Sequence, residues 1–445
     1  MIINKKKIVS SSEFKNQFRS NKNLNAKYGL TQDVKFCKKC VNSNQVPVSE
    51  IEFKHVISTI KKGVNFDQED ICDACKYFEI KKTKIDWKLR EQELIDLCNK
   101  HRRLDGGYDC IVPGSGGKDS FMQSHLLKYK YNMNPLTITW APHMYTDWGL
   151  KNFNSWLGSG FDNIKVTPNP LVHRLLTRLA VENLFHPFQP FILGQKGLAP
   201  KIAEKLGIKL IFYGENEAEY HNSINENNEA KRNYKYFSEA NEDEIFLGGT
   251  SIDDLKKKFG LVESDIEMYK PINPDKLKSK NIEVHYLGYY KPWHPQGAYY
   301  YAVEHGNFQA SPERTQGTYS KYNSIDDKID DFHYYTTFIK FGIGRTTYDA
   351  AQEVRNEEIS REEAIALVKK YDGEYPNRFE NEIFDYLSIK KEEFPIASKQ
   401  FEQPEMTKEY FFYLQDYFRS PHLWYLDDND NWILRNAIWK GKNSI

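Results

Sequence analysis

The stretch IVPGSGGKDSF, residues 111–121, joins an apolar run to a glycine-rich turn that ends in a lysine, an aspartate and a serine. A buried strand that leads through glycines into a helix typically forms a phosphate cradle. The backbone N–H groups at the helix start are unpaired, and the helix dipole favours an anion there. Glycine also lets the backbone approach a ligand closely, since it carries no Cβ atom. The stretch therefore predicts a phosphate-binding loop.

Two familiar phosphate loops do not fit this stretch. The Walker loop requires a glycine where Val112 stands, and a serine or threonine after its lysine, where Asp119 follows Lys118. The dinucleotide fingerprint G-x-G-x-x-G requires its third glycine at position 119. What remains is the sextet SGGKDS, residues 115–120, directly after an apolar run.

The segments around the loop alternate between strand-like and helix-like patterns. Apolar runs at residues 108–113, 134–142, 163–169 and 208–214 indicate four strands. Helical patterns lie between them at 119–129, 147–157, 170–184 and 198–206, and a polar helix at 86–103 begins after Asp86 as its N-cap. This alternation indicates an α/β fold with a parallel sheet that is covered by helices on both faces.

Composition shifts along the chain suggest four parts. Residues 1–30 are polar and rich in lysine and asparagine, and we expect a loosely held arm. Residues 31–85 contain two cysteine pairs, and residues 86–260 contain the alternating strands and helices. Residues 261–445 turn aromatic and then mostly helical, which suggests a region that binds substrate or partners.

Four of the six cysteines form two C-x-x-C pairs, Cys37 with Cys40 and Cys72 with Cys75. Two such hairpins supply the four thiolates of a tetrahedral Zn²⁺ site, although the segment between them is longer than in common zinc ribbons. Two unrelated reduced pairs, or an iron–sulfur or redox site, remain alternatives. The last two cysteines are single, and one of them lies in the first expected strand.

Charge and hydropathy exclude some classes of function. The chain of 445 residues has 62 basic and 62 acidic residues, and a neutral balance argues against nucleic-acid binding as its main role. No apolar stretch is long enough for a signal peptide or a membrane span, so we expect a cytoplasmic protein without a membrane partner.

The sextet resembles the signature of the ATP pyrophosphatase (PP-loop) superfamily, whose fold is adenine nucleotide alpha hydrolase-like. Three further segments, residues 137–163, 191–220 and 332–364, resemble the N-acetyl sugar amidotransferases of lipopolysaccharide O-antigen and nonulosonic acid biosynthesis. The resemblance extends from about Cys37 to Pro376. It implies an enzyme that adenylates the oxygen of an acetamido group on a nucleotide-activated sugar and lets ammonia displace AMP, which leaves an acetamidino group.

The resemblance also implies site residues. ATP, with Mg²⁺, would be bound by the loop and by the ends of the second and fourth strands, at Gly114, Ser115, Gly116, Gly117, Lys118, Asp119, Ser120, Trp140, Ala141 and Gly214. Lys118 would add positive charge at the pyrophosphate and Asp119 would help to hold Mg²⁺. Glu215 and Asn216 would bind Mg²⁺ or position the amide. For Trp140, simple core packing is an equal alternative.

Other candidates carry more open alternatives. Thr146, Gly149 and Asn152 match the T-x-x-G-x-x-N pattern of the family. By charge, Lys340 or Arg345 could bind a nucleotide phosphate or a sugar carboxylate, or form structural ion pairs. A further set could shape a sugar pocket or pack in the core: Lys291, Trp293 and His294.

The chain shows no glutaminase cysteine of its own, since Ile2 follows Met1 and no cysteine has an elbow of glycines around it. The resemblance implies that ammonia comes from a separate glutaminase, with partners similar to the glutaminase and cyclase subunits of imidazole glycerol phosphate synthase. A PP-loop tRNA thiolase, with a basic RNA face and a catalytic cysteine near ATP, is the alternative enzyme. A zinc-bearing scaffold with an inactive loop is the alternative outside enzymes.

Overall fold

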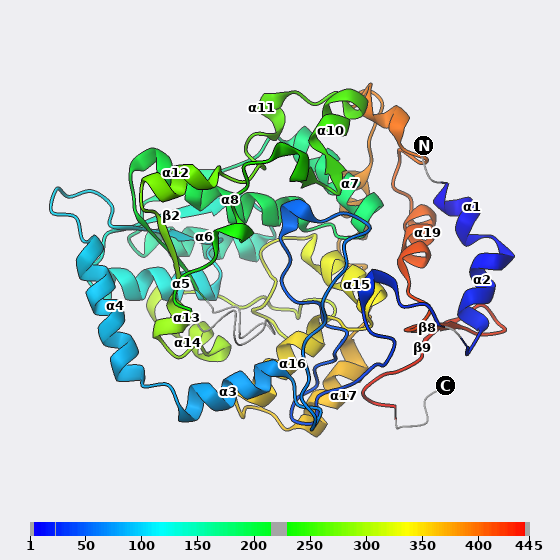
Figure 1. Ribbon diagram of the computed structural model, residues 1–445, viewed down its shortest axis with the longest axis horizontal. Coiled ribbons are helices and arrows are strands. Elements are labelled where there is room, and N and C mark those ends of the chain that lie inside the picture. Colours follow the sequence, from blue (N-terminus) through cyan, green and yellow to red (C-terminus); the bar gives the residue numbers. More distant parts are fainter. Residues whose placement is uncertain (1–3, 23, 215–228, 441–445) are drawn as a thin grey trace.

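The computed structural model describes residues 4–22, 24–214 and 229–440. At its centre lies a five-stranded parallel sheet in the order β3-β2-β1-β4-β7 (Figure 1). Its strands are β1 (Cys110–Pro113), β2 (Pro135–Trp140), β3 (Asn163–Val166), β4 (Leu210–Tyr213) and β7 (Glu283–Tyr286). The four expected strands are confirmed. The fifth comes from beyond residue 260, so the expected end of the α/β part at that residue is too early.

The order of the strands creates a crevice beside the phosphate loop. From β1 the chain first builds outward through β2 and β3, and then returns to pair β4 with the other side of β1, where Ile111 lies opposite Ile211. Open parallel sheets bind ligands beyond the carboxyl ends of their strands at such a reversal. The loop that follows β1 and Gly214 after β4 both lie at this point.

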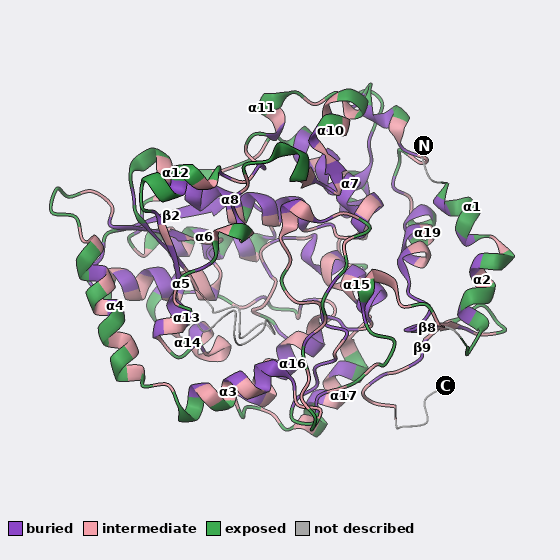
Figure 2. Cartoon of the chain, in the orientation of Figure 1, coloured by how far each residue is buried: buried purple, intermediate pink, exposed green. Residues whose placement is uncertain are grey.

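Alternating side chains bury both faces of the sheet. Ile111 and Ile211 pack with residues of α7 (Pro170–Leu184) and α8 (Gln189–Leu206). Cys110 and Val112, on the opposite face, pack with α4 (Trp87–His101) and with the π-helical turn Leu126–Lys130 that continues α5 (Lys118–His125). Figure 2 shows the contrast between the largely buried α7 and α8 and the exposed outer side of α4.

Helix α8 begins at Gln189, nine residues before the expected start, and continues through Pro200. A proline inside a helix removes the hydrogen bond to the carbonyl four residues earlier. Here the Tyr213 hydroxyl donates to the carbonyl oxygens of Lys196 and Gln195, at 3.4 and 3.5 Å. The sequence pattern missed the first half of this helix because its proline suggests a helix start.

The N-terminal arm is not loosely held, contrary to expectation. Its helices α1 (Lys5–Val9) and α2 (Ser12–Arg19) lie beside α19 (Lys408–Phe418) at the right of Figure 1. Phe14 and Phe18 are buried, and the Lys5 ammonium lies 2.9 Å from the Glu182 carboxylate. The polar composition concealed this docking, because two phenylalanines one helical turn apart are enough to create an apolar face.

The remaining elements surround the sheet, and the helical character expected of the C-terminal region is confirmed. No described helix combines the length and the apolar character that a bilayer span requires. These elements are α3 (Asp73–Thr83), α6 (Asp147–Gly158), β5 (Phe246–Leu247), β6 (Thr250–Ser251), α10 (Ile252–Phe259), α11 (Glu263–Ile266), α12 (Pro274–Ser279), α13 (Leu287–Tyr290), α14 (Pro295–Gly306), α15 (Asp330–Phe341), α16 (Arg345–Arg355), α17 (Arg361–Tyr371), α18 (Glu380–Leu387), β8 (Trp424–Leu426) and β9 (Trp432–Leu434).

Candidate functional site

The phosphate loop after β1 has a backbone that only glycine accommodates at two positions. Gly116 has a φ of +89°, and a Cβ atom there would lie 2.6 Å from the Cα atom of Phe153. At Gly114 a Cβ atom would lie 2.3 Å from the Cβ atom of Ser120. Gly117 is the N-cap of α5 and has no side chain to cap it, so the first turn of this helix keeps N–H groups for a ligand.

The charged residues of the loop form a close pair. The Lys118 ammonium lies 2.5 Å from Oδ2 of Asp119, and the lysine side chain is only 9% exposed. Oδ1 of Asp119 is buried and has no hydrogen-bond partner among the described residues. A carboxylate oxygen without a donor, beside a phosphate cradle, fits a hard cation such as Mg²⁺.

Two cavities meet at the loop. The larger has a volume of about 630 Å³ and the smaller about 360 Å³. Ser115, Gly117 and Asp119 line both of them. The loop therefore lies where the two cavities adjoin.

The smaller cavity is the crevice at the strand reversal, and Gly214 and Ser120 line it as expected for a nucleotide site. Arg232 also lines it, a residue that the sequence did not single out. Its guanidinium carbon lies 5.2–5.6 Å from the ring centres of Tyr213, Tyr236 and Tyr286. Aromatic rings at this distance attract a guanidinium, and a guanidinium can bind phosphate in a bidentate manner.

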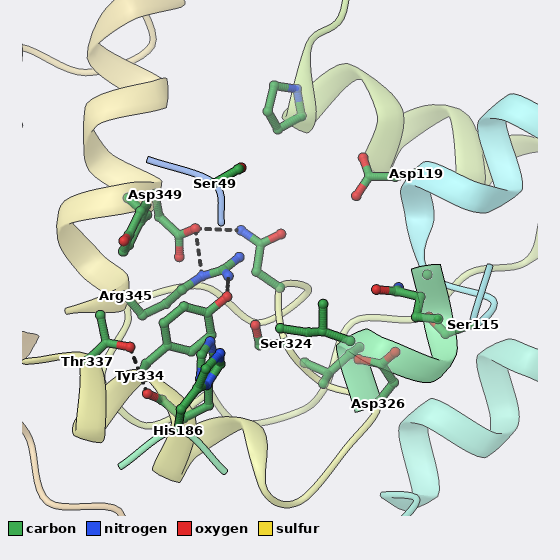
Figure 3. A pocket seen from close by; sticks show the side chains of 18 of the residues that line it. Ser49, Ser115, Asp119, His186, Ser324, Asp326, Tyr334, Thr337, Arg345 and Asp349 are labelled. Atoms are coloured by element: carbon green, nitrogen blue, oxygen red, sulfur yellow. Dashed lines mark hydrogen bonds and ion pairs between the residues drawn. The ribbon is translucent and has the colours of Figure 1, made fainter. Parts of the chain in front are cut away.

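The larger cavity lies between the loop and the C-terminal region. Figure 3 shows Ser115 and Asp119 on one side of it and Arg345 with Tyr334 on the other. The segment 47–61, between the two cysteine pairs, supplies a third wall. Three distant parts of the chain therefore build one site.

Arg345 and Lys340 both line this larger cavity. The Arg345 guanidinium forms an ion pair with Asp349 at 3.0 Å and donates to the Tyr334 hydroxyl. The Lys340 ammonium donates to the carbonyl of Leu184 at 2.7 Å, and burial holds its pKa well below the ordinary value. For Arg345 the structural ion pair is present, and its guanidinium still faces the cavity.

Asp326 is a cavity residue that the sequence analysis missed. It lines the larger cavity together with Ser115 of the loop, and burial raises the pKa of its carboxyl group. The pair of aspartates at 326 and 327 was a visible signal, but a run of acids is usually a solvated surface. The loop and this part of the C-terminal region therefore face the same cavity.

The T-x-x-G-x-x-N residues hold the segment around Asp326 in place. The Thr146 hydroxyl donates to the carbonyl of Ile325, and a Cβ atom on Gly149 would lie 2.5 Å from the Cα atom of Asp326. The Asn152 side chain exchanges two hydrogen bonds with the backbone of Gln309, at 2.9 and 2.8 Å. Gly149 and Asn152 also line the larger cavity.

The expected adenosine residues lie behind the loop. Trp140 is buried, packs on Tyr269, and leaves no space for a Cβ atom at Gly194. The Ala141 N–H donates to the carbonyl of Val166 at 2.9 Å. Neither residue lines the two cavities, but Trp140 lines a small hollow behind the loop together with Gly114 and Ser115. Its role in adenosine binding therefore stays a prediction. Glu215 and Asn216 lie outside the described residues.

Of the three residues that could shape a sugar pocket, Trp293 lines the larger cavity, although its side chain is almost wholly buried. Lys291 pairs with Glu91 at 3.3 Å. His294 accepts from the Gly297 N–H at the start of α14, at 2.8 Å, and its other ring nitrogen lies 2.8 Å from Glu358. The two charged candidates thus make contacts within the fold.

The four paired cysteines converge into one buried cluster. Their sulfur atoms all lie within 4.8 Å of one another, with Cys37 to Cys75 at 3.8 Å and Cys40 to Cys72 at 3.7 Å. Tetrahedral Zn–S bonds of about 2.3 Å place sulfurs about 3.8 Å apart, whereas a disulfide needs about 2 Å. The cluster is compatible with Zn²⁺.

Hydrogen bonds to the sulfurs and a contact with the C-terminal region complete this centre. The N–H groups of Cys40 and Cys72 donate to the Cys37 sulfur at 3.5 and 3.4 Å, as is typical around metal thiolates. Arg361 of α17 donates to the carbonyls of Cys37 and Cys40. The cluster therefore anchors the third wall of the larger cavity to the C-terminal helices.

Comparison with known families assigns that C-terminal region. Residues 316–438 match the family described as LPS biosynthesis protein WbpG-like, C-terminal domain. Over these residues the chain is similar to a WbpG-like C-terminal domain. The match supports the resemblance to the amidotransferases of lipopolysaccharide biosynthesis, and it extends beyond Pro376, where that resemblance was expected to end. Asp326, Tyr334 and Arg345 all belong to the WbpG-like domain.

A relative in the archaeon Methanocaldococcus jannaschii is an uncharacterized protein, MJ1599, that is 32% identical over 81 residues. The aligned part covers 18% of this chain and 28% of that protein. This chain therefore spans little more than a quarter of the curated relative that it matches.

Proposed function

We propose that the protein is the synthetase component of an ATP-dependent sugar amidotransferase. The observation that carries this proposal is the SGGKDS loop, which lies between a crevice at the strand reversal and a cavity walled by the WbpG-like domain. An adenylating enzyme needs this arrangement, because ATP and the acceptor must meet at the α-phosphate. The nucleotide would occupy the smaller cavity and the acetamido sugar the larger one.

The loop would hold the phosphates through the N–H groups at the start of α5 and through Lys118. Arg232, fixed between its three tyrosines, would bind the phosphate groups from the other side of the crevice. Mg²⁺ on Oδ1 of Asp119 would neutralise phosphate charge. Four positive or donor groups thus surround the place where the pyrophosphate leaves.

The chemistry would proceed in two steps. The amide oxygen of the acceptor attacks the α-phosphorus, the bond to pyrophosphate breaks, and the amide N–H proton is released. Ammonia then adds to the imidate carbon and AMP leaves, which gives the acetamidino group. An amide oxygen is a poor leaving group. Attachment of AMP to this oxygen makes its displacement by ammonia possible.

The partners belong to the proposal as well. The acceptor is a nucleotide-activated acetamido sugar in surface polysaccharide biosynthesis. The glutaminase and cyclase-like subunits that the resemblance implies would deliver ammonia from glutamine.

The tRNA thiolase alternative requires a catalytic cysteine near ATP. All six cysteines are within the described residues, and all are buried. Four form the cluster and two pack in the core, and none lines either cavity. This placement favours nitrogen over sulfur as the incoming nucleophile.

The decisive test is mass spectrometry of candidate acetamido sugar nucleotides after incubation with the protein, ATP, Mg²⁺ and ammonium. We expect a product in which NH replaces the amide oxygen, together with AMP. Formation of ADP, or AMP formed without any change in a full panel of acetamido sugars, would contradict the proposal. Omission of ammonium serves as the control and should leave acceptor-dependent pyrophosphate exchange intact.

A further inference from the structure

Lys196 of α8 lies where the two cavities adjoin, and the mechanism above gives it no role. It lines both the larger and the smaller cavity. Among the lysines and arginines that the structure describes in these two linings, Lys196 alone belongs to both. The larger cavity is also lined by Lys61, Lys118, Lys340 and Arg345, and the smaller one by Arg232. One positive side chain therefore lies at the boundary between the proposed sites for ATP and for the acceptor.

Helix α8 directs Lys196 toward this boundary. Ile192, Gln195 and Lys196 all line the larger cavity, and positions i, i+3 and i+4 share one face of a helix. Gly194, on another face, brings the helix so close to β2 that a Cβ atom there would lie 2.1 Å from the Trp140 ring. The helix also contacts β1, which leads into the phosphate loop. The backbone of Lys196 is therefore held close to that loop.

The end of β4 contacts the same turn of α8. Pro200 has no N–H, so the carbonyl of Lys196 lacks the hydrogen bond that a helix normally supplies. The Tyr213 hydroxyl, which donates to this carbonyl at 3.4 Å, belongs to the last residue of β4 and lines the smaller cavity. The turn that carries Lys196 is therefore fixed to the strand that ends at the smaller cavity.

The charge of Lys196 also acts within the larger cavity. Burial raises the pKa of Glu50, while the charges of Lys61 and Lys196 oppose this rise. Burial alone would raise the pKa of Glu52, but two histidines at 3.7 Å and the charge of Lys196 hold it well below the ordinary value. A carboxylate beside an ammonium favours the charged form of both groups. Lys196 therefore contributes a positive charge on the acceptor side of the boundary as well.

The proposed reaction develops negative charge at this same boundary. When the amide oxygen attacks, the α-phosphorus exchanges its bond to pyrophosphate for a bond to the acceptor. The roles given above to Lys118, Arg232 and Mg²⁺ concern the departing pyrophosphate, so the oxygens of the α-phosphate still need a cation. A positive group that is already in position where charge develops lowers the barrier of phosphoryl transfer.

We propose that the Lys196 ammonium binds the α-phosphate of ATP and stabilises its transfer to the acceptor oxygen. This inference rests on the proposed function. In the first step the bond between the amide oxygen and the α-phosphorus forms, pyrophosphate leaves with the electron pair of its broken bond, and the amide proton goes to solvent. In the second step the C–O bond breaks and AMP leaves with that electron pair. Lys196 keeps its proton in both steps and contributes only its charge.

The variant Lys196→Met removes the charge and keeps a long unbranched side chain. Acceptor-dependent exchange of pyrophosphate into ATP, measured with the sugar nucleotide that the mass spectrometry identifies, should fall about 100- to 1000-fold. Binding of α,β-methylene ATP, which cannot release pyrophosphate, should stay close to that of the wild type and shows that the variant folds. The matched control is Lys205→Met, at an exposed residue of the same helix outside both cavities, and it should exchange like the wild type.

Sulfur substitution on the α-phosphate tests the contact itself. Two diastereomers of ATP carry sulfur in place of one or the other non-bridging α-oxygen. In the wild type, the isomer with sulfur at the oxygen that Lys196 contacts should turn over more slowly than ATP. In Lys196→Met that isomer should turn over nearly as fast as ATP does, because the contact is already lost. A lysine with a merely structural role would lower the rates with ATP and with both isomers by the same factor, and that result would overturn the inference.

The outcomes also separate this inference from the proposed function. Exchange at the wild-type rate in Lys196→Met would overturn the inference and leave the proposed function standing. Loss of α,β-methylene ATP binding in parallel with exchange would assign Lys196 to ground-state binding and would overturn the inference too. Absence of exchange and of AMP in the wild type would overturn the proposed function, and this inference with it.

Discussion

The phosphate loop and the floor of the larger cavity are built in opposite ways. The loop is six consecutive residues, 115–120, and its chemistry is visible in the chain before any folding is considered. The floor combines Glu52, His55, His186 and His333, which lie up to 281 positions apart in the sequence. A contiguous motif reveals which reaction is possible. An assembled surface gathers side chains from distant parts of the chain, and only the fold displays it.

The largest effect is expected at the cysteine cluster, because the cluster anchors the segment 47–61 that forms a wall of the larger cavity. Cys37→Ser should abolish stoichiometric zinc and sharply lower the melting temperature, since structural zinc contributes about 10–16 kcal/mol of apparent binding free energy. The measurements are metal content and thermal unfolding. Cys98→Ser, at a buried cysteine outside the cluster, is the matched control and should keep its zinc with a smaller loss of stability. Equal zinc content in the two variants would contradict a metal role for the cluster.

The loop itself is tested by Asp119→Asn. Loss of the carboxylate should reduce AMP formation by about 100- to 1000-fold while the fold persists, because the proposed contact with Mg²⁺ would be removed. The rate of AMP release and the far-UV circular dichroism spectrum report these two properties. The exposed residue Asp428 provides the control Asp428→Asn, which should remain fully active. Normal turnover of the Asp119 variant would remove this residue from the mechanism.

The tight backbone of the loop predicts a difference between two glycine variants. Gly116→Ala combines a left-handed φ with a clash against the Phe153 backbone, and should lower the free energy of unfolding by about 3 kcal/mol or more. Gly106→Ala has a similar φ of +79° but open space around it, and should cost only about 1 kcal/mol. Chemical denaturation measures both values. Equal losses of unfolding free energy in the two variants would show that the close packing behind the loop does not contribute to stability.

The smallest effect concerns His422, whose ring nitrogens bind Ser420 at 2.7 Å and Gln45 at 2.9 Å. Burial, reinforced by Arg435, lowers the pKa of His422 to about 4 in the folded protein. The unfolded chain binds a proton near pH 6.5 and the folded chain does not. This contribution to stability is therefore present above pH 6.5 and is lost as the pH falls toward 4.

The size of this pH effect of His422 on stability can be predicted. Between pH 6.5 and 4, the wild type should lose about 2–3 kcal/mol more than His422→Gln does. Denaturation midpoints at several pH values measure the difference. Parallel pH profiles for the two proteins would show that His422 does not link residue 45 to the C-terminal strands in the way that the structure indicates.

The sequence predicted the parts of the fold that depend on local periodicity. The four strands around the loop, the helix after Asp86 and the convergence of the cysteines all follow from patterns of a few residues. The fifth strand was missed because residues 283–286 are short and mix charged with apolar side chains. The first half of α8 was missed because prolines at 190 and 200 suggest helix starts.

In the candidate site too, some residues could be predicted from the sequence and others could not. Ser115, Gly117, Asp119 and Gly214 line the cavities, as the motif indicates. The acidic pair that contains Asp326 looks like an ordinary solvated surface in the sequence, and Arg232 has no local signature. The environment of both residues is created by segments far away in the sequence. The placement of Trp140 depends on packing against Gly194, which no pattern within β2 reveals. Side chains whose role is set by distant neighbours therefore require the structure.

One consequence follows from the position of the segment 47–61. It leaves the cysteine cluster after Cys40 and returns to it before Cys72, and in between it forms a wall of the larger cavity. Under the proposed function, metal loading and acceptor recognition would be linked during biogenesis. A newly made chain would complete the larger cavity only once the four thiolates have been gathered, so shortage of the metal would silence the proposed activity while the phosphate loop remained intact.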